Sequence, residues 1–409
     1  MSAAKSDRAD AIALLFEDKP YSFAELARLV QSSAPSPSVI TAKDPLATAL
    51  HLYACLETHQ PLCILPASAR REELAQATER MRGIDRDIAL VLFTSGSQGQ
   101  PKGVMLSRSA LVASAEASAR RHTWQDQERW LCCLPLHHIG GLSVLLRCLI
   151  DRQTAVLLDG FEVETVARAL HQGAITRVSM VPTMLWRLLE AGHRAPPGLR
   201  LVLIGGAALD PQLMERALAA GYPVVHSYGL TETASQIVVM GRALDGVQLR
   251  VRRGRLEVRG PMLMRDYLPP HSDAAIGADG WLQTQDRARL HADGRVSILG
   301  RSDSVIISGG ENIDLQKVEA GVQRCSGVKL CVALGLPHPE WGQELVALVL
   351  GAPGLDGARL RAEVDARLEG HLRPKRLLLV EEIPLLDNGK VDRQNARAIA
   401  ESQHTEHPE

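Results

Sequence analysis

A loop of small polar residues followed by a lysine lies between residues 91 and 107, where the chain reads V-L-F-T-S-G-S-Q-G-Q-P-K-G-V-M-L-S. Serine, threonine and glycine leave backbone N–H groups and hydroxyls open to an approaching phosphate, and the lysine adds positive charge. The string is not a Walker loop, because Lys102 lies between Pro101 and Gly103. We predict a polyphosphate-binding loop of another kind, formed by Thr94, Ser95, Gly96, Ser97, Gly99 and Lys102.

A second string that could do chemistry is Tyr228-Gly229-Leu230-Thr231-Glu232-Thr233. Its carboxylate lies beside two hydroxyl groups directly after a predicted strand, and oxygen ligands of this kind suit a Mg²⁺ ion shared with ATP. We expect Glu232 and Thr231 to hold the metal, while Tyr228 offers a flat face to a purine. Taken alone, the string would also suit a surface turn.

Together and in this order, the two strings resemble the adenylate-forming superfamily of acyl- and aryl-CoA synthetases, adenylation domains and luciferases. The resemblance extends over nearly the whole chain. Two positions depart from the usual pattern, since Gln98 stands where threonine is usual and Gln285 where glycine is usual.

The resemblance assigns four further residues to the nucleotide. Gly206 lies in a segment that passes the adenine, and Asp286 would accept hydrogen bonds from both ribose hydroxyls. Arg301 would reach the nucleotide from the junction between two domains. Lys390, which follows an Asn-Gly turn, would bridge the reacting carboxylate and the α-phosphate.

The resemblance also implies residues for the acid, for CoA and for a hinge. The acid would be bound by His138, Gly205 and Ser235. The pantetheine arm of CoA would pass Ser308, Gly309 and Gly310, whose glycines allow a thin chain to approach the backbone. Asp303 is expected to act as the hinge between the domains.

The implied reaction is the ATP- and Mg²⁺-dependent conversion of a carboxylic acid to an acyl-adenylate, followed by transfer of the acyl group to CoA. Residues 231–238, His138, the loop of residues 308–313 and the compact length together most resemble CoA ligases for an aromatic acid that carries a second carboxylate. Another aryl- or acyl-CoA ligase, or a free-standing adenylation domain that loads a carrier protein, remains an alternative. A nucleotide-binding protein without catalysis is the alternative from another class.

The composition excludes several kinds of partner. Because 46 basic residues balance 47 acidic ones, no overall field would draw the chain to nucleic acid or to an anionic membrane. No run approaches the roughly 18 apolar residues of a membrane span, and the first residues do not resemble a signal peptide. We therefore expect a cytoplasmic enzyme with small-molecule partners, and leave a homo-oligomer open. Seven cysteines without a C-x-x-C pair are expected to be reduced core residues.

These candidate residues need a framework that brings strand ends together. From residue 131 to residue 228 strand and helix patterns alternate, which predicts a parallel sheet covered by helices, with ligands at the carboxyl ends of its strands. Short strands with Asp-Gly turns follow residue 241. The expected fold is α/β. A large N-terminal domain of parallel and mixed sheets with a β-rich subdomain would span residues 1–302, and a small mobile α+β domain residues 303–409.

Local signals predict several element boundaries. Ser22 with Glu25 three residues later predicts a capping box, and a helix is expected over residues 45–58. Asp210 followed by proline predicts another helix start. Thr183 is expected to cap a helix that ends at Gly192, and residues 401–409 are expected to fray.

Overall fold

The computed structural model describes residues 9–32, 38–94, 101–269 and 275–405. The chain divides into two compact units. The first contains Met1–Val251, Glu257–Thr284 and Leu290–Val296, and the second contains Arg252–Leu256, Gln285–Arg289 and Ser297–Glu409. The domain boundary expected between residues 302 and 303 stays a prediction.

A nine-stranded sheet forms the centre of the first unit, in the order β13-β12-β11-β10-β9-β7-β8-β1-β2. The neighbours from β11 to β1 run parallel, whereas β2, β12 and β13 pair antiparallel at the two edges. The strands are β1 (Ile12–Phe16), β2 (Lys19–Ser22), β7 (Arg129–Cys132), β8 (Thr154–Leu157), β9 (Arg177–Met180), β10 (Leu201–Ile204), β11 (Val224–Leu230), β12 (Ser235–Val239) and β13 (Arg242–Ala243).

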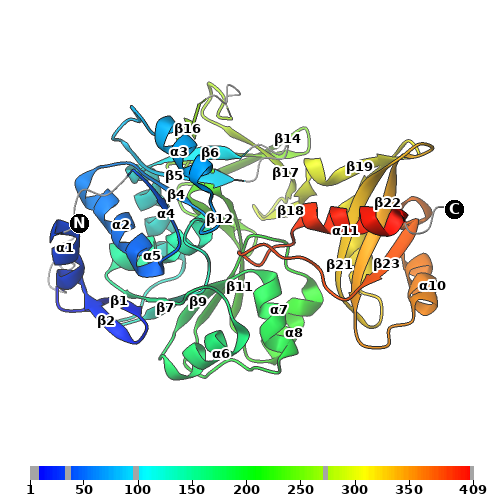
Figure 1. Ribbon diagram of the computed structural model, residues 1–409, viewed down its shortest axis with the longest axis horizontal. Helices are drawn as coiled ribbons and strands as arrows, with labels where there is room; N and C mark the ends of the chain where they lie inside the picture. Colours follow the sequence, from blue (N-terminus) through cyan, green and yellow to red (C-terminus); the bar gives the residue numbers. More distant parts are fainter. Residues whose placement is uncertain (1–8, 33–37, 95–100, 270–274, 406–409) are drawn as a thin grey trace. The chain divides into compact units, whose positions relative to one another are not determined.

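Helices cover both faces of this sheet, as the alternating pattern predicted. One face packs on α6, α7 and α8 around a core that includes Leu131, Val178 and Val202 (Figure 1). Trp130 alternates with Leu131 and therefore faces the other side, where α5 contacts β7 and β8. The helices are α5 (Ile139–Asp151), α6 (Val163–Gln172), α7 (Pro182–Glu190) and α8 (Pro211–Ala219).

A five-stranded sheet in the same unit carries the residues on either side of the phosphate loop, in the order β16-β6-β5-β4-β3. Strands β5 and β6 pair antiparallel, with Thr94 opposite Lys102, so residues 95–100 connect the two strands. The elements are β3 (Val39–Thr41), β4 (Leu62–Leu65), β5 (Ile88–Thr94), β6 (Lys102–Ser107) and β16 (Asp266–Tyr267), with α1 (Phe23–Ser32), α2 (Pro45–Thr58), α3 (Arg71–Arg80) and α4 (Arg108–Arg121).

Short strands follow, as the Asp-Gly turns predicted. They form a four-stranded sheet in the order β14-β15-β17-β18. Its strands are β14 (Gln248–Arg252), β15 (Arg255–Arg259), β17 (Leu282–Leu290) and β18 (Val296–Arg301).

The second unit is α+β, with the strand order β20-β19-β22-β21 and β23 paired to β22. Helices α9 and α10 pack on one face of β21 and β22, and α11 packs on the other. The elements are β19 (Val305–Ser308), β20 (Glu311–Asp314), α9 (Leu315–Gln323), β21 (Val328–His338), β22 (Gly342–Gly351), α10 (Gly357–Arg367), β23 (Arg376–Val380) and α11 (Arg393–Thr405).

Three of the predicted helix signals are confirmed. The N–H of Ser22 donates to Glu25 Oε2 (2.7 Å) and the N–H of Glu25 donates to Ser22 Oγ (3.1 Å), which completes the capping box. Asp210 accepts from the N–H groups of Gln212 and Leu213 at the start of α8. Helix α2 spans the residues expected.

Two boundary predictions are wrong. Helix α7 begins at Pro182 and ends at Glu190, so Thr183 lies inside its first turn; proline fits this position because its missing N–H needs no partner there. Helix α11 continues to Thr405, so the prediction is wrong for residues 401–405, whereas residues 406–409 lie outside the described residues. Its apolar side, with Ala396 and Ala400 buried, holds it against the sheet.

All seven cysteines are free and buried, as expected. Among the described residues, no helix combines the length and apolar content that crossing a lipid bilayer requires.

The junction of β11 and β12 depends on Gly229. A Cβ atom there would lie 2.0 Å from the carbonyl oxygen of Ser235 and 2.6 Å from Gln236 Cα. We predict that Gly229→Ala lowers the free energy of unfolding by about 1–3 kcal/mol or more, as overpacking against backbone does. The matched change Gly198→Ala enters open space and should shift it by no more than about 0.5 kcal/mol. Equal melting temperatures for the two variants would contradict this account.

Candidate active site

Three predicted site residues lie at the carboxyl ends of parallel strands. His138 follows β7, Gly205 follows β10, and Tyr228 lies near the end of β11. The strand register places Cys132 beside Ser179, and Ile204 beside both Met180 and His226. Parallel neighbours end at the same edge, so the structure gathers these residues along one edge, as a sheet of this kind does for its ligands.

A short 3₁₀ turn, η2 (Thr231–Thr233), presents the predicted metal ligands directly after β11. Thr233 is fully buried, accepts from the N–H of Leu230 (2.9 Å) and donates to the carbonyl of Ser235 (2.8 Å). Thr231 and Glu232 are only half-buried. Thr233 therefore fixes the turn, while Thr231 and Glu232 are left accessible.

Lys102 and Glu232 lie around one tyrosine, although Lys102 belongs to the five-stranded sheet and Glu232 to the turn that follows a strand of the nine-stranded sheet. The Lys102 ammonium is 5.1 Å from the centroid of the Tyr267 ring. The Tyr267 hydroxyl donates to Glu232 Oε1 at 2.9 Å. Sequence reasoning missed Tyr267; its only signal was an aromatic residue in a chain with 3% aromatics.

The rest of the predicted phosphate loop can be placed only in part. Thr94 ends β5, and its hydroxyl donates to the Lys102 carbonyl at 3.4 Å. Ser95, Gly96, Ser97 and Gly99 lie outside the described residues. Gly206, after β10, has a positive φ of 81°, which glycine adopts without strain.

A buried arginine accompanies the residues predicted for the acid. Arg147 lies on α5, is 2% exposed, and donates from Nη2 to Ser235 Oγ at 3.1 Å. Burial lowers its pKa to about 10, so it stays positively charged near neutral pH. Among the described residues no carboxylate pairs with it, and its Nε has no hydrogen-bond partner.

His138 precedes α5 at its N-cap position, half-buried, with its ring 4.1 Å from that of His137. His138 therefore lies at the start of α5, and Arg147 lies nine residues further along the same helix, where it contacts Ser235. Arg147 was missed in the sequence, where its signal is a cation within the apolar run L-S-V-L-L-R-C-L-I.

In the second unit, Arg301 and Asp303 pair with each other. Arg301 Nε and Nη2 donate to the two oxygens of Asp303 at 2.7 and 2.5 Å. Asp286 is buried, and the neighbouring Gln285 accepts a bond from the Ser302 hydroxyl (2.9 Å). The unusual glutamine thus has a partner within its own unit. The predicted roles of Arg301, Asp303 and Asp286 stay predictions.

The predicted CoA-binding residues form the turn between β19 and β20. Gly309 and Gly310 both have positive φ, 57° and 85°, and Ser308 pairs with Glu311 across the hairpin. A Cβ at Gly309 would lie 3.0 Å from the Trp341 ring. The glycines are therefore required by this tight turn, whatever passes beside it.

Lys390 closes another turn of the second unit, where its N–H donates to Asn388 Oδ1 at 3.0 Å. Desolvation lowers the pKa of the Lys390 ammonium, and the Arg301 cation lowers it further, although the residue as a whole keeps exposed surface. The two predicted nucleotide-binding cations of this unit therefore lie close enough to influence each other.

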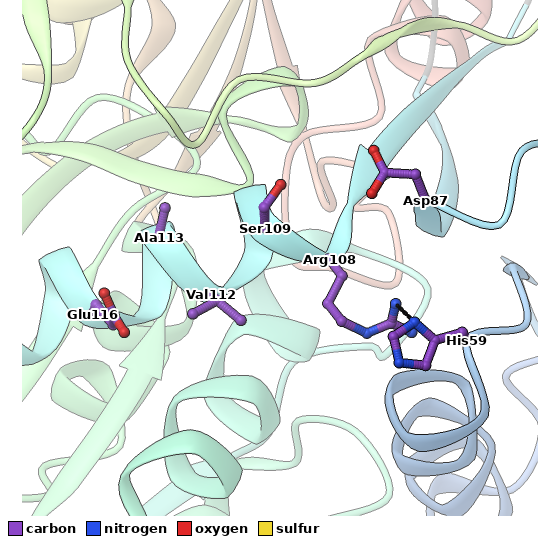
Figure 2. A pocket seen from close by; sticks show the side chains of 7 residues that line it. All are labelled: His59, Asp87, Arg108, Ser109, Val112, Ala113 and Glu116. Carbon is purple, nitrogen blue, oxygen red and sulfur yellow. Dashed lines mark hydrogen bonds between the residues drawn. The ribbon is translucent and has the colours of Figure 1, made fainter. Parts of the chain in front are cut away.

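A surface hollow of about 450 Å³ lies elsewhere on the first unit (Figure 2), lined by His59, Asp87, Arg108, Ser109, Val112, Ala113 and Glu116. Arg108 donates there to His59 Nδ1 (3.0 Å) and to the carbonyls of Cys55 and Leu56 at the end of α2. Ser107 pairs with Ile88 at one end of the β5–β6 hairpin, and Lys102 lies at the other. The hollow is therefore separate from the candidate active site.

Comparison with known proteins agrees with this fold. Residues 38–268 match the AMP-binding enzyme family, and residues 317–390 match the AMP-binding enzyme C-terminal domain. The chain therefore belongs to the AMP-binding, adenylate-forming enzyme family, and the predicted family and fold class are confirmed.

Among its relatives are enzymes named 2-succinylbenzoate–CoA ligase. The chain is 33% identical to that of Listeria monocytogenes serotype 4b over 326 residues, which cover 76% of this chain and 69% of the relative. It is 36% identical to a probable 2-succinylbenzoate–CoA ligase of Mycobacterium tuberculosis over 343 residues, which cover 81% of this chain and 89% of the relative.

Solved structures of a Bacillus subtilis enzyme share the fold. o-Succinylbenzoate CoA synthetase (MenE) in complex with its acyl-adenylate intermediate has a TM-score of 0.80 and 27% identity, covering 96% of this chain and 97% of that one. The same enzyme in complex with ATP and a magnesium ion has a TM-score of 0.80 and 26% identity, covering 96% and 98%.

Two buried charge arrangements should respond oppositely to substitution. Glu128 is buried between Arg177, which donates from Nε at 2.8 Å, and Arg200. Glu128→Gln leaves both cations short of a partner and should cost about 3–5 kcal/mol. Arg147→Met removes an unneutralised buried charge, so its melting temperature should equal or exceed that of the wild type. A fall as large as that of Glu128→Gln would make Arg147 a structural residue.

Proposed function

We propose that this chain activates 2-succinylbenzoate with ATP, through an acyl-adenylate, and transfers the acyl group to CoA as a step of menaquinone biosynthesis. The observation that carries the proposal is the meeting of Lys102 and Glu232 around Tyr267. A phosphate-binding cation and a metal-binding carboxylate are what an ATP-dependent ligase must hold side by side. The names of the relatives support the choice of acid, and a cytoplasmic location is part of the proposal.

The nucleotide would be bound mainly by groups of the first unit. Lys102 would balance phosphate charge, and Tyr228 would lie against the adenine. Glu232 Oε1 already accepts from Tyr267, whereas Oε2 and the Thr231 hydroxyl make no hydrogen bonds within the described residues. In ATP-dependent enzymes Mg²⁺ is bound by water, by phosphate oxygens and by only one or two protein oxygens. Glu232 Oε2 and the Thr231 hydroxyl would serve as such protein ligands. When bound, the ion would neutralise charge that develops on the phosphate oxygens.

The acid explains the buried cation. 2-Succinylbenzoate carries two carboxylates, and the one that does not react loses water when it is bound, which is costly unless donors replace that water. Arg147 offers a charge that no described carboxylate neutralises, and Ser235 adds a hydroxyl. An ion pair between this carboxylate and Arg147 would offset the free-energy cost that each charge has for losing its water. His138 lies at the start of the same helix, and its ring would contact the acid at that end of the helix.

The second unit would supply different groups to the two half-reactions. We propose that Lys390 and Arg301 serve adenylation, with Asp286 on the ribose. A turn of residues 303–409 about Asp303 would then replace Lys390 by Ser308, Gly309 and Gly310 for the attack of CoA. Separate arrangements keep two different reactions from competing for one cavity.

The choice of acid can be tested by ATP–pyrophosphate exchange across a panel of carboxylic acids. We expect faster exchange with 2-succinylbenzoate than with benzoate or medium-chain acids. Arg147→Met should weaken the diacid by about 1.5–3 kcal/mol, roughly ten- to a hundredfold, and leave benzoate almost unchanged. Arg147→Lys keeps the charge and should retain more affinity. A wild type that prefers monoacids would indicate a general acyl- or aryl-CoA ligase, and no exchange with any acid would indicate a protein without catalysis.

The role of Lys390 can be tested by separating the half-reactions. Lys390→Ala should abolish exchange because the ammonium is needed beside the α-phosphate. It should largely spare thioester formation from supplied acyl-adenylate. Lys317→Ala, which changes an exposed lysine of α9 in the same unit, serves as the control. Equal loss of both half-reactions in Lys390→Ala would argue against this division.

A further inference from the structure

The segment that carries Tyr267 is held from both sides by backbone hydrogen bonds. On one side, the N–H of Leu268 donates to the Gly103 carbonyl at 2.7 Å and β16 pairs with β6. On the other, the N–H of Met264 donates to the Glu232 carbonyl at 2.8 Å. A Cβ at Gly103 would already lie 3.0 Å from Leu268 Cβ, so the glycine after Lys102 permits this approach. The position of Tyr267 is therefore fixed relative to both Lys102 and Glu232.

The side chain of Tyr267 contacts two groups of opposite charge. Its hydroxyl donates to Glu232 Oε1, and its ring lies 5.1 Å from the Lys102 ammonium. A lysine and a glutamate this close to one ring would attract each other, and a direct ion pair would have to be broken before phosphate and metal could bind. Within the described ranges, Lys102 and Glu232 form no such pair.

We propose that Tyr267 is a positioning residue for adenylation. Its hydroxyl fixes Glu232 so that Oε2 stays available to the metal–nucleotide complex, and its ring keeps Lys102 as a partner for phosphate instead of for Glu232. This inference rests on the proposed function and adds to it a residue that touches neither reacting atom.

A structural tyrosine would behave differently. Tyr222 is buried in the core of the same unit, and its hydroxyl has no hydrogen-bond partner among the described residues. Tyr222→Phe therefore makes the same chemical change without removing a hydrogen bond. A packing role for Tyr267 would lower the melting temperature and slow both half-reactions together, whereas a positioning role changes only what depends on Glu232 and Lys102.

The test compares Tyr267→Phe with Tyr222→Phe, with Glu232→Gln as the reference for a lost metal ligand. We expect Tyr267→Phe to raise the Mg²⁺ concentration for half-maximal ATP–pyrophosphate exchange by about ten- to a hundredfold, the range for a hydrogen bond to a charged group. Thioester formation from supplied acyl-adenylate should change less than threefold. Without any acid, Mn²⁺–ATP binding measured by electron paramagnetic resonance should weaken in the same order, while Tyr222→Phe resembles the wild type.

Each outcome decides between the possibilities. If Tyr267→Phe keeps wild-type Mg²⁺ dependence and Mn²⁺–ATP affinity while the wild type is active, the positioning role is wrong and the proposed function stands. Equal slowing of both half-reactions with a lower melting temperature would likewise make Tyr267 structural. If the wild type binds Mn²⁺–ATP and Tyr267→Phe weakens that binding, but no acid supports exchange, the positioning of nucleotide holds and the proposed ligase activity fails.

Discussion

The candidate site depends on one short stretch of backbone, residues 264–268, that is hydrogen-bonded both to the five-stranded sheet and to the turn after β11 of the nine-stranded sheet. Lys102 belongs to the five-stranded sheet and Glu232 follows a strand of the nine-stranded sheet, so neither sheet alone could set the distance between them. The N–H groups of Met264 and Leu268 connect the two. Backbone hydrogen bonds between sheets hold more rigidly than contacts between long side chains, which suits a site where charges must be placed before the substrate arrives.

The first unit contains a buried carboxylate that is paired with arginines and a buried arginine that is not paired with any described carboxylate. Glu128, Arg177 and Arg200 satisfy one another, and two tryptophan rings lie against Arg177. Within the part of the chain that the structure describes, Arg147 contacts only a hydroxyl, that of Ser235, and the Trp130 ring. A buried cation without a counter-ion costs folding free energy. A bound anion would pair with Arg147 beside Ser235, and the binding of that anion would offset the folding free energy that the unpaired cation costs.

Two cations of the second unit, Arg301 and Lys390, lie close enough for their charges to interact. Asp303 pairs with Arg301 through two hydrogen bonds, and the pKa of the Lys390 ammonium is lowered first by desolvation and then by the Arg301 cation. A guanidinium has five N–H groups, so a bidentate pair with Asp303 does not by itself prevent a contact with phosphate. Asp303, the predicted hinge residue, therefore also orients Arg301, the arginine predicted to reach the nucleotide.

The sequence by itself determined the fold class and the family, and it supplied the candidate residues of the nucleotide site. It could do so because helix caps, alternating strand and helix patterns and glycine turns are local, and because the phosphate and metal strings are contiguous. The tertiary structure alone decided which distant groups meet. Tyr267 contacts Glu232, which lies 35 residues earlier in the chain, and Lys102, which lies 165 residues earlier. Arg147 and Ser235 are in contact although 88 residues separate them. No local pattern encodes such contacts, because they follow from strand order and from the side chains that a second sheet or helix brings near.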